Sequence, residues 1–151
     1  MSKEHMNAFR EARKIMGFKH TSAYVPSNRL TDFSLYVERL KAERMLEICE
    51  MSPQSGERKA LANRNVIDVP TVQEVMAMIG RFPNQPNLNR QAQQCIKSLE
   101  DANAAQNVAR QAEDNDDYVK WASKAVAHNH MANVLWRELA HSAHQLEAYG
   151  G

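Results

Sequence analysis

Apolar positions recur most regularly in the C-terminal third of the chain. Between residues 118 and 149, ten positions follow a strict three-four spacing, and eight of the ten are apolar or aromatic, as a coiled-coil seam requires. They are Tyr118, Trp121, Ala125, His128, Ala132, Leu135, Leu139, Ser142, Leu146 and Tyr149. The same spacing gives a second row of Leu88, Ala92, Cys95, Leu99, Ala102, Gln106 and Ala109. We therefore predict an antiparallel, coiled-coil-like hairpin of two long helices over residues 88–151.

This predicted seam is uneven along its length. Large side chains gather at the base, where Leu88, Leu99, Leu135, Trp136 and Leu139 lie, whereas alanine dominates near the turn. Each methylene that alanine lacks relative to leucine forgoes about 0.8 kcal/mol of burial free energy. We expect the N-terminal helices to pack on the base and a partner to dock on the outer half.

Two helices are predicted before residue 64. Residues 3–16 form an amphipathic pattern, with Met6, Phe9, Ala12 and Met16 on one face and Gly17 as the stop. Residues 29–51 form the second helix, which Pro53 ends. Its apolar stripe is predicted to consist of Leu30, Phe33, Val37, Leu40, Arg44 and Ile48. The polar segment SPQSGERK that follows is expected to be a loop.

A short helix is predicted in the middle of the chain. Residues 66–69 fit a short strand or a buried linker, and Thr71 and Glu74 have the spacing of a capping box. Val72, Val75, Met76 and Ile79 are its predicted buried side, Gly80 ends it, and residues 81–87 form a proline-containing connector. The chain is thus expected to be all-α, with an N-terminal helical region at 1–64, a short helix and connector at 65–87, and the hairpin at 88–151.

Composition agrees with a globular cytoplasmic protein. The net charge is +1, but residues 1–64 carry 12 Lys and Arg against 8 Asp and Glu, and residues 65–151 carry 7 against 10. Cys49 and Cys95 stand on apolar helix positions, which favours buried free thiols in a reducing compartment. The first 14 residues have no apolar core of a signal peptide, and no apolar run approaches the roughly 20 residues of a membrane span.

The histidines and acids raise the question of a metal. Four of the six histidines lie between residues 128 and 144, and Glu138, His141 and His144 have the helical spacing of a carboxylate-bridged site in a bundle. Such a site needs a second Glu-x-x-His, which the chain lacks. Asp114, Asp116 and Asp117 alternate as in calcium loops, but helix capping explains them without a metal. A metal-binding helical bundle is therefore kept as an alternative.

Signatures of catalysis are missing from the sequence. There is no G-x-S-x-G motif, no glycine-rich phosphate loop and no histidine placed beside either cysteine by sequence. We therefore expect a protein that is not an enzyme and that needs no cofactor.

Residues 70–90 raise the question of DNA binding. Thr71-Val72, Glu74-Val75 and Gly80 stand where a helix-turn-helix has its helix opening and turn, so the stretch resembles that segment of small transcription regulators. It departs from the pattern because Met76 replaces a small residue and Pro86 would break a recognition helix. The resemblance implies Arg81 and Arg90 as the nucleic-acid contacts, with the hairpin as dimeriser.

The leading hypothesis is a non-enzymatic interaction protein. Long helical hairpins offer docking surfaces, and Trp and Tyr are frequent interface anchors. A short chain with few motifs is typical of small bacterial or phage accessory proteins, such as regulators and inhibitors. We expect another protein, or a second copy in a homodimer, to bind Asp114, Asp116, Asp117, Tyr118, Trp121, His128 and Trp136.

Overall fold

The structure is a computed structural model that describes residues 16–50, 55–63 and 68–149. Within these residues it consists of a 3₁₀ turn, η1, and five α-helices without a strand. They are η1 (Ser27–Arg29), α2 (Leu30–Glu50), α3 (Ser55–Ala62), α4 (Val72–Gly80), α5 (Pro86–Gln111) and α6 (Asn115–Tyr149). The prediction of an all-α fold is confirmed. The helix predicted over residues 3–16 lies outside the described residues, except for its last residue.

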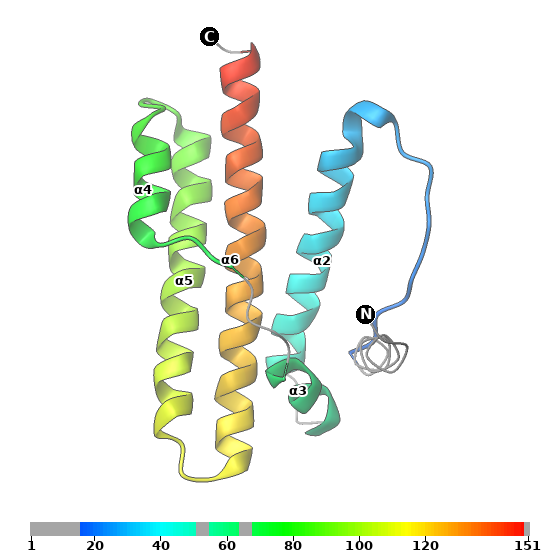
Figure 1. Cartoon of the computed structure of the whole chain (residues 1–151), viewed down its shortest axis with the longest axis vertical. Helices are drawn as coiled ribbons and strands as arrows, with labels where there is room; N and C mark the ends of the chain where they lie inside the picture. Colours follow the sequence, from blue (N-terminus) through cyan, green and yellow to red (C-terminus); the bar gives the residue numbers. More distant parts are fainter. Residues whose placement is uncertain (1–15, 51–54, 64–67, 150–151) are drawn as a thin grey trace.

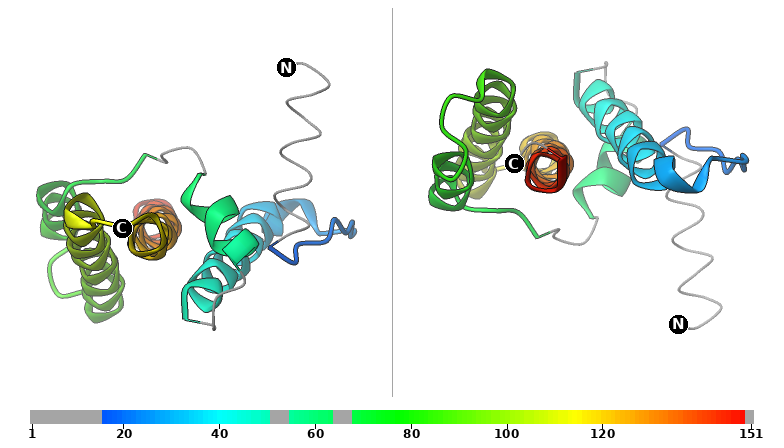
Figure 2. Two further views of the ribbon diagram at one scale, coloured as in Figure 1. Left: turned by 90° about the horizontal axis from the view of Figure 1, so that it is seen from below. Right: turned by 90° about the horizontal axis from the view of Figure 1, so that it is seen from above.

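The longest helix, α6, forms the centre of the molecule. Figure 2 shows α6 between α5 on one side and α2 with α3 on the other, while α4 packs on the outside of α5. α5 and α6 lie side by side in opposite directions and are joined by a turn at residues 112–114 (Figure 1). This arrangement buries two sides of α6, whereas the predicted seam required only one.

Two clusters of buried side chains form the core. The first holds the base of the hairpin together and includes Leu88, Ile96, Leu135 and Leu139, against which α4 packs with Val75. The second joins α2, α3 and the middle of α6 through Met16, Met45, Ile48, Cys49, Leu61 and Ala127. The N-terminal helices thus pack along α6, with Leu46 touching both clusters.

The predicted seam is buried on the α5 side at most positions. Leu88, Ala92, Cys95, Ala102 and Ala109 are buried there. On α6, Ala125, Ala132, Leu135 and Leu139 are buried, whereas Tyr118 is exposed. Ala127 and Val134 are also buried although they are off the predicted seam, because α2 and α3 cover that second side.

The capping box that begins α4 is present as predicted. The Glu74 amide donates to Thr71 Oγ1 at 3.1 Å, and the Thr71 amide donates to Glu74 Oε1 at 3.2 Å. Each side chain therefore satisfies an amide that has no partner within the helix. Of the predicted buried side, Val75 is buried and Ile79 is packed on the core, but Val72 and Met76 are exposed.

One local prediction is wrong, and two others hold only in part. The loop expected over SPQSGERK is a helix from Ser55 onward, because Leu61 buries completely against α2 and α6 and this contact outweighs the polar composition. Of the short strand or buried linker predicted over residues 66–69, residues 66 and 67 lie outside the described residues, and residues 68 and 69 are exposed and not in a strand. The predicted connector over residues 81–87 is shorter than expected, because α5 begins at Pro86, where an amide would have no helical partner.

The apolar stripe predicted for α2 is not the face through which this helix packs on the rest of the molecule. Leu30, Phe33 and Leu40 are exposed, and the helix instead packs through Leu35, Ala42, Met45, Ile48 and Cys49. Only Ile48 belongs to both sets. α2 therefore has a covered apolar face and an exposed one.

Candidate interaction surface

The turn between α5 and α6 carries the acidic group singled out in the sequence. Asp114, Asp116 and Asp117 are all exposed. Asp114 Oδ1 accepts a hydrogen bond from the Asp117 amide at 2.8 Å, so Asp114 caps α6 as predicted. The carboxylates also lie at the positive end of the helix dipole, which stabilises them there. The result is an ordered, negatively charged tip.

The outer hairpin, which we define as residues 102–122, has only alanine in its buried seam. The buried residues are Ala102, Ala105, Ala109 and Ala122. Two large apolar side chains of the same segment are exposed, Val108 at 41% and Tyr118 at 48%. Tyr118 was predicted as a partner contact because tyrosine is a frequent interface anchor, although its seam position alone would predict burial. Val108 was missed because it lies off the three-four spacing, and only the packing of α5 shows which side faces solvent.

The two tryptophans and His128, which were predicted as partner contacts, are half-buried. Trp121 is half-buried, with Lys124 Nζ 4.4 Å and Lys120 Nζ 5.6 Å from the centre of its ring. Trp136 packs against the first core cluster. His128 is half-buried, and burial lowers its pKa below the ordinary 6.5, which nearby Asp101 opposes. Trp136 therefore belongs to the core, whereas Tyr118 and Trp121 remain within the outer hairpin.

The predicted metal-binding set does not come together. Glu138 accepts a hydrogen bond from Arg39 Nη1 at 2.7 Å, and His141 Nε2 lies 2.8 Å from Asp32 Oδ1, so both side chains join α6 to α2. His144 is exposed. Among the described residues, no three His, Cys, Asp or Glu side chains are grouped so as to hold a metal ion. Glu138 and His141 do have the helical spacing of a metal site, but each contacts a side chain of α2 instead.

The two arginines of the DNA-binding alternative lie in different surroundings, one paired with a carboxylate and one exposed on α5. Arg81 pairs with Glu147 and lies over the Phe82 ring at 5.6 Å. Arg90 is exposed on the first turns of α5. α4 and α5 do follow each other across a short turn, but α5 is the first arm of the hairpin and packs along α6. The expectation that both arginines contact DNA stays a prediction.

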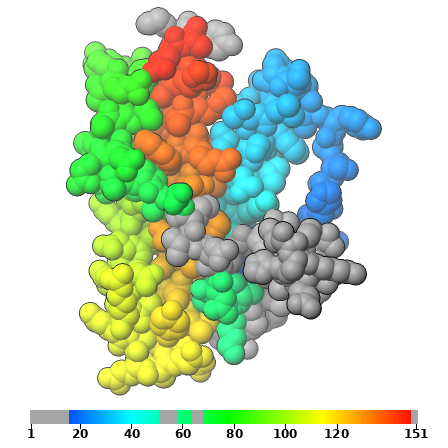
Figure 3. All heavy atoms as spheres, viewed as in Figure 1, coloured from blue at the N-terminus to red at the C-terminus, as the bar shows by residue number. Residues whose placement is uncertain are grey.

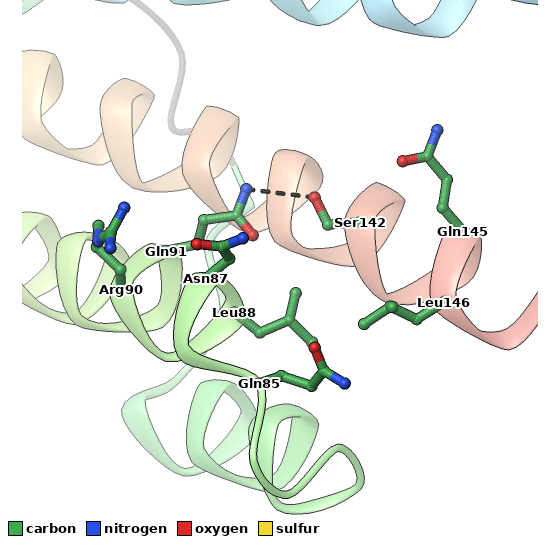
Figure 4. Close-up of a pocket in the computed structure, with 8 residues that line it drawn as sticks. All are labelled: Gln85, Asn87, Leu88, Arg90, Gln91, Ser142, Gln145 and Leu146. Atoms are coloured by element: carbon green, nitrogen blue, oxygen red, sulfur yellow. Dashed lines mark hydrogen bonds between the residues drawn. The ribbon is translucent and has the colours of Figure 1, made fainter. Parts of the chain in front are cut away.

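Arg90 also lines a pocket of about 680 Å³ between the start of α5 and the end of α6 (Figure 4). Its polar lining consists of Gln85, Asn87, Arg90, Gln91, Ser142 and Gln145. Gln91 Nε2 donates to Ser142 Oγ at 3.2 Å, and Gln91 Oε1 is buried without a hydrogen-bond partner. This lining can hydrogen-bond, and it contains no nucleophile paired with a base.

The two cysteines are buried free thiols, as predicted. Burial raises the pKa of Cys95 to about 11, and burial likewise raises the pKa of Cys49, whose Sγ lies 3.7 Å from Ser123 Oγ. Because the thiolate is the reactive form, both groups are poorly suited to nucleophilic attack. Their role in the described structure is to fill the core.

Comparisons with protein-family models, curated proteins and solved structures gave no match for this chain. None of the helices in the described ranges combines the length and the apolar character needed to cross a membrane.

Proposed function

We propose that this chain is a non-enzymatic interaction protein that docks on a partner protein through its outer hairpin. The observation that carries the proposal is the exposure of Val108 and Tyr118 beside a seam made only of alanine. Exposed apolar side chains grouped near one end of a molecule are a frequent sign of an interface. The turn end lies beyond the ends of α2 and α4, and it is uncovered in the view of Figure 3.

The negative charge of the turn end favours a partner surface of positive charge. Val108 and Tyr118 stand four residues before and four residues after the turn at 112–114, and that turn is flanked by exposed carboxylates. A complementary surface would offer an apolar groove edged with Lys or Arg. Such charges would speed association and lose their effect as salt rises. The proposed partner is therefore a protein with a basic rim around an apolar groove.

A capture experiment tests this proposal. The tagged chain is incubated with lysate of its source organism, and bound proteins are quantified by mass spectrometry. The double variant Val108→Asp with Tyr118→Asp should lose the specific partner at least about tenfold, the effect of 1.4 kcal/mol. The matched control is Val72→Asp with Met76→Asp, which places the same charges on exposed apolar positions of α4.

The two variants give opposite expectations. Capture retained by the control and lost by the hairpin variant supports the proposal. Equal capture by both variants and by the unaltered chain would show that the outer hairpin is not the docking surface.

A second copy of the chain is the other occupant that the sequence suggested. A homodimer through the hairpin would raise the sedimenting mass to twice the 17.2 kDa of the chain. Sedimentation equilibrium at micromolar concentration separates the two cases, since a strict monomer removes the homodimer and leaves the heterologous partner.

A further inference from the structure

The start of α5 is rich in side-chain amides and poor in negative charge. Seven of the eleven residues from 84 to 94 are Asn or Gln, and no Asp or Glu occurs between residues 75 and 99. Asn is a weaker helix former than Glu or Lys, so helix propensity does not account for this composition. The segment instead supplies carboxamide groups, each of which both donates and accepts hydrogen bonds without carrying a charge.

The fold makes this segment one wall of the pocket between the start of α5 and the end of α6 (Figure 4). Asn84 has a left-handed backbone conformation, with φ of 67°, which asparagine adopts more readily than most residues. It directs the chain into Gln85 and the first turn of α5. The resulting pocket of about 680 Å³ is within the size range of known ligand sites, roughly 300–1,000 Å³.

The polar lining of the pocket is suited to hydroxyl groups. Gln91 Nε2 donates to Ser142 Oγ at 3.2 Å, whereas Gln91 Oε1 is buried without a hydrogen-bond partner. A buried acceptor without a donor is costly, so a ligand O–H that donates to it would remove that cost. A hydroxyl both donates and accepts, and so does each carboxamide of the lining. Leu88 and Leu146, which pack together, supply an apolar surface for the C–H groups of the same ligand.

The charge of the pocket is positive. Arg90 is the charged residue of the lining, which includes no carboxylate. Within the described ranges no Asp or Glu pairs with Arg90, whereas the neighbouring Arg81 pairs with Glu147. A guanidinium presents parallel N–H donors that match two oxygens of a carboxylate or a phosphate. The lining therefore favours an oxyanion beside Arg90 and hydroxyl groups beside the carboxamides.

We propose that this pocket binds a small polyhydroxylated anion, namely a sugar phosphate or a sugar acid. Its phosphate or carboxylate would pair with Arg90, and its hydroxyls would hydrogen-bond to the carboxamides of Asn87 and Gln91. A neutral sugar lacks the group for Arg90, and inorganic phosphate lacks the hydroxyls. The pocket lies at the opposite end of the hairpin from the turn at residues 112–114, so this site is separate from the proposed docking surface.

Isothermal titration calorimetry on the full-length chain tests this proposal with four probes. Glucose 6-phosphate and gluconate carry both hydroxyls and an oxyanion, glucose carries only the hydroxyls, and inorganic phosphate only the oxyanion. The first two should bind with a Kd of about 1 mM or less, and the other two at least about tenfold more weakly. The titration needs no partner protein, so its outcome is independent of the proposed function.

Variants at exposed positions assign the binding to the pocket without disturbing the core. Arg90→Gln should weaken binding of both anions at least about tenfold, and Asn87→Ala about threefold, the effect of one neutral hydrogen bond. The matched control is Arg110→Gln, at an exposed position near the other end of α5, which should bind as the unaltered chain does. Absence of binding by both anions at about 10 mM, or equal binding by Arg90→Gln, would overturn the proposal. Inorganic phosphate binding as tightly as glucose 6-phosphate would also overturn it.

Discussion

At the scale of single residues, His128 shows how a partly buried histidine makes the stability of the fold depend on pH. It occupies a position of the predicted seam and is half-buried, and this burial lowers its pKa from 6.5. Its folded pKa is therefore below the value in the unfolded chain. The unfolded chain binds more protons once the pH falls below about 6.5, so acid favours unfolding through this residue.

We expect His128→Gln to reduce the pH dependence of stability. In the unaltered chain, the contribution of His128 is fully present above about pH 6.5 and is lost as the pH falls through the folded pKa. Urea unfolding measured between about pH 7 and pH 5 should show a smaller loss of unfolding free energy for His128→Gln. Gln93→Ala, at an exposed position without a titrating group, is the control and should keep the original slope. Identical slopes for all three proteins would contradict the assignment.

The cap of α4 gives a second prediction at a single residue. Thr71→Ala removes the oxygen that accepts from the Glu74 amide, and this should lower the free energy of unfolding by about 1 kcal/mol. Urea denaturation measures the change. Thr21→Ala, in the exposed segment before η1, should change stability by less than about 0.5 kcal/mol. If Thr71→Ala lowered the free energy of unfolding no more than Thr21→Ala does, the capping box would add no measurable stability.

At the scale of elements, α2 is attached to α6 by polar as well as apolar contacts. Arg39 pairs with Glu138, and Asp32 contacts His141, on the half of α2 that also carries the exposed Leu30, Phe33 and Leu40. The lower half is attached by the fully packed Met45 and Ile48. Polar pairs that are partly exposed are weaker than buried apolar packing. The upper half of α2 is thus the less firmly attached half.

A double-mutant cycle on Arg39→Ala and Glu138→Ala should measure a coupling of about 0.2–1 kcal/mol. The side chains are 37% and 19% exposed, so solvent screening keeps the value in this range. Urea unfolding of the four proteins gives the coupling, which should fall when salt is raised. Lys97 and Asp101, an exposed pair 3.5 Å apart within α5, provide a comparison cycle with a smaller expected value. A coupling free energy of zero at low salt would show that the Arg39–Glu138 pair does not help to hold α2 on α6.

At the scale of the whole molecule, stability is concentrated in the base of the hairpin. Leu139 is fully buried among Leu88, Leu135 and Val75, where α4, α5 and α6 meet. The outer hairpin buries alanines and so gains less from the removal of apolar surface from water. We infer that the base determines global unfolding, while the outer hairpin opens at a lower free energy.

Leu139→Ala should therefore lower the free energy of unfolding by about 2–5 kcal/mol, through lost burial and a residual cavity. Val108→Ala, at the exposed outer position, should change it by less than about 0.5 kcal/mol. Both values come from urea denaturation followed by circular dichroism. Similar losses for the two variants would show that the outer hairpin is as firmly packed as the base.

Sequence periodicity predicted the helices that local signals define strongly. The capping box at Thr71 and the cap at Asp114 were both predicted, because each needs only residues within one turn. Sequence periodicity failed for α2, because this helix has two apolar faces and the pattern does not show which of them is buried. For α2 the pattern favoured Leu30, Phe33 and Leu40, whereas the helix buries Ala42 and Met45 instead. The polar composition of residues 52–59 also predicted a loop, whereas α3 begins at Ser55 and is held in the core by Leu61.

By itself, the sequence determined the all-α class, the alanine seam near the turn and the acidic tip. These depend on helix propensity, spacing and capping, which act between residues close in the chain. Only the tertiary structure decided which face of α2 is buried, that Glu138 and His141 bind α2, and that Val108 is exposed. The physical reason is that burial depends on which elements lie alongside one another, and α6 contacts residues as far as 109 positions away in sequence.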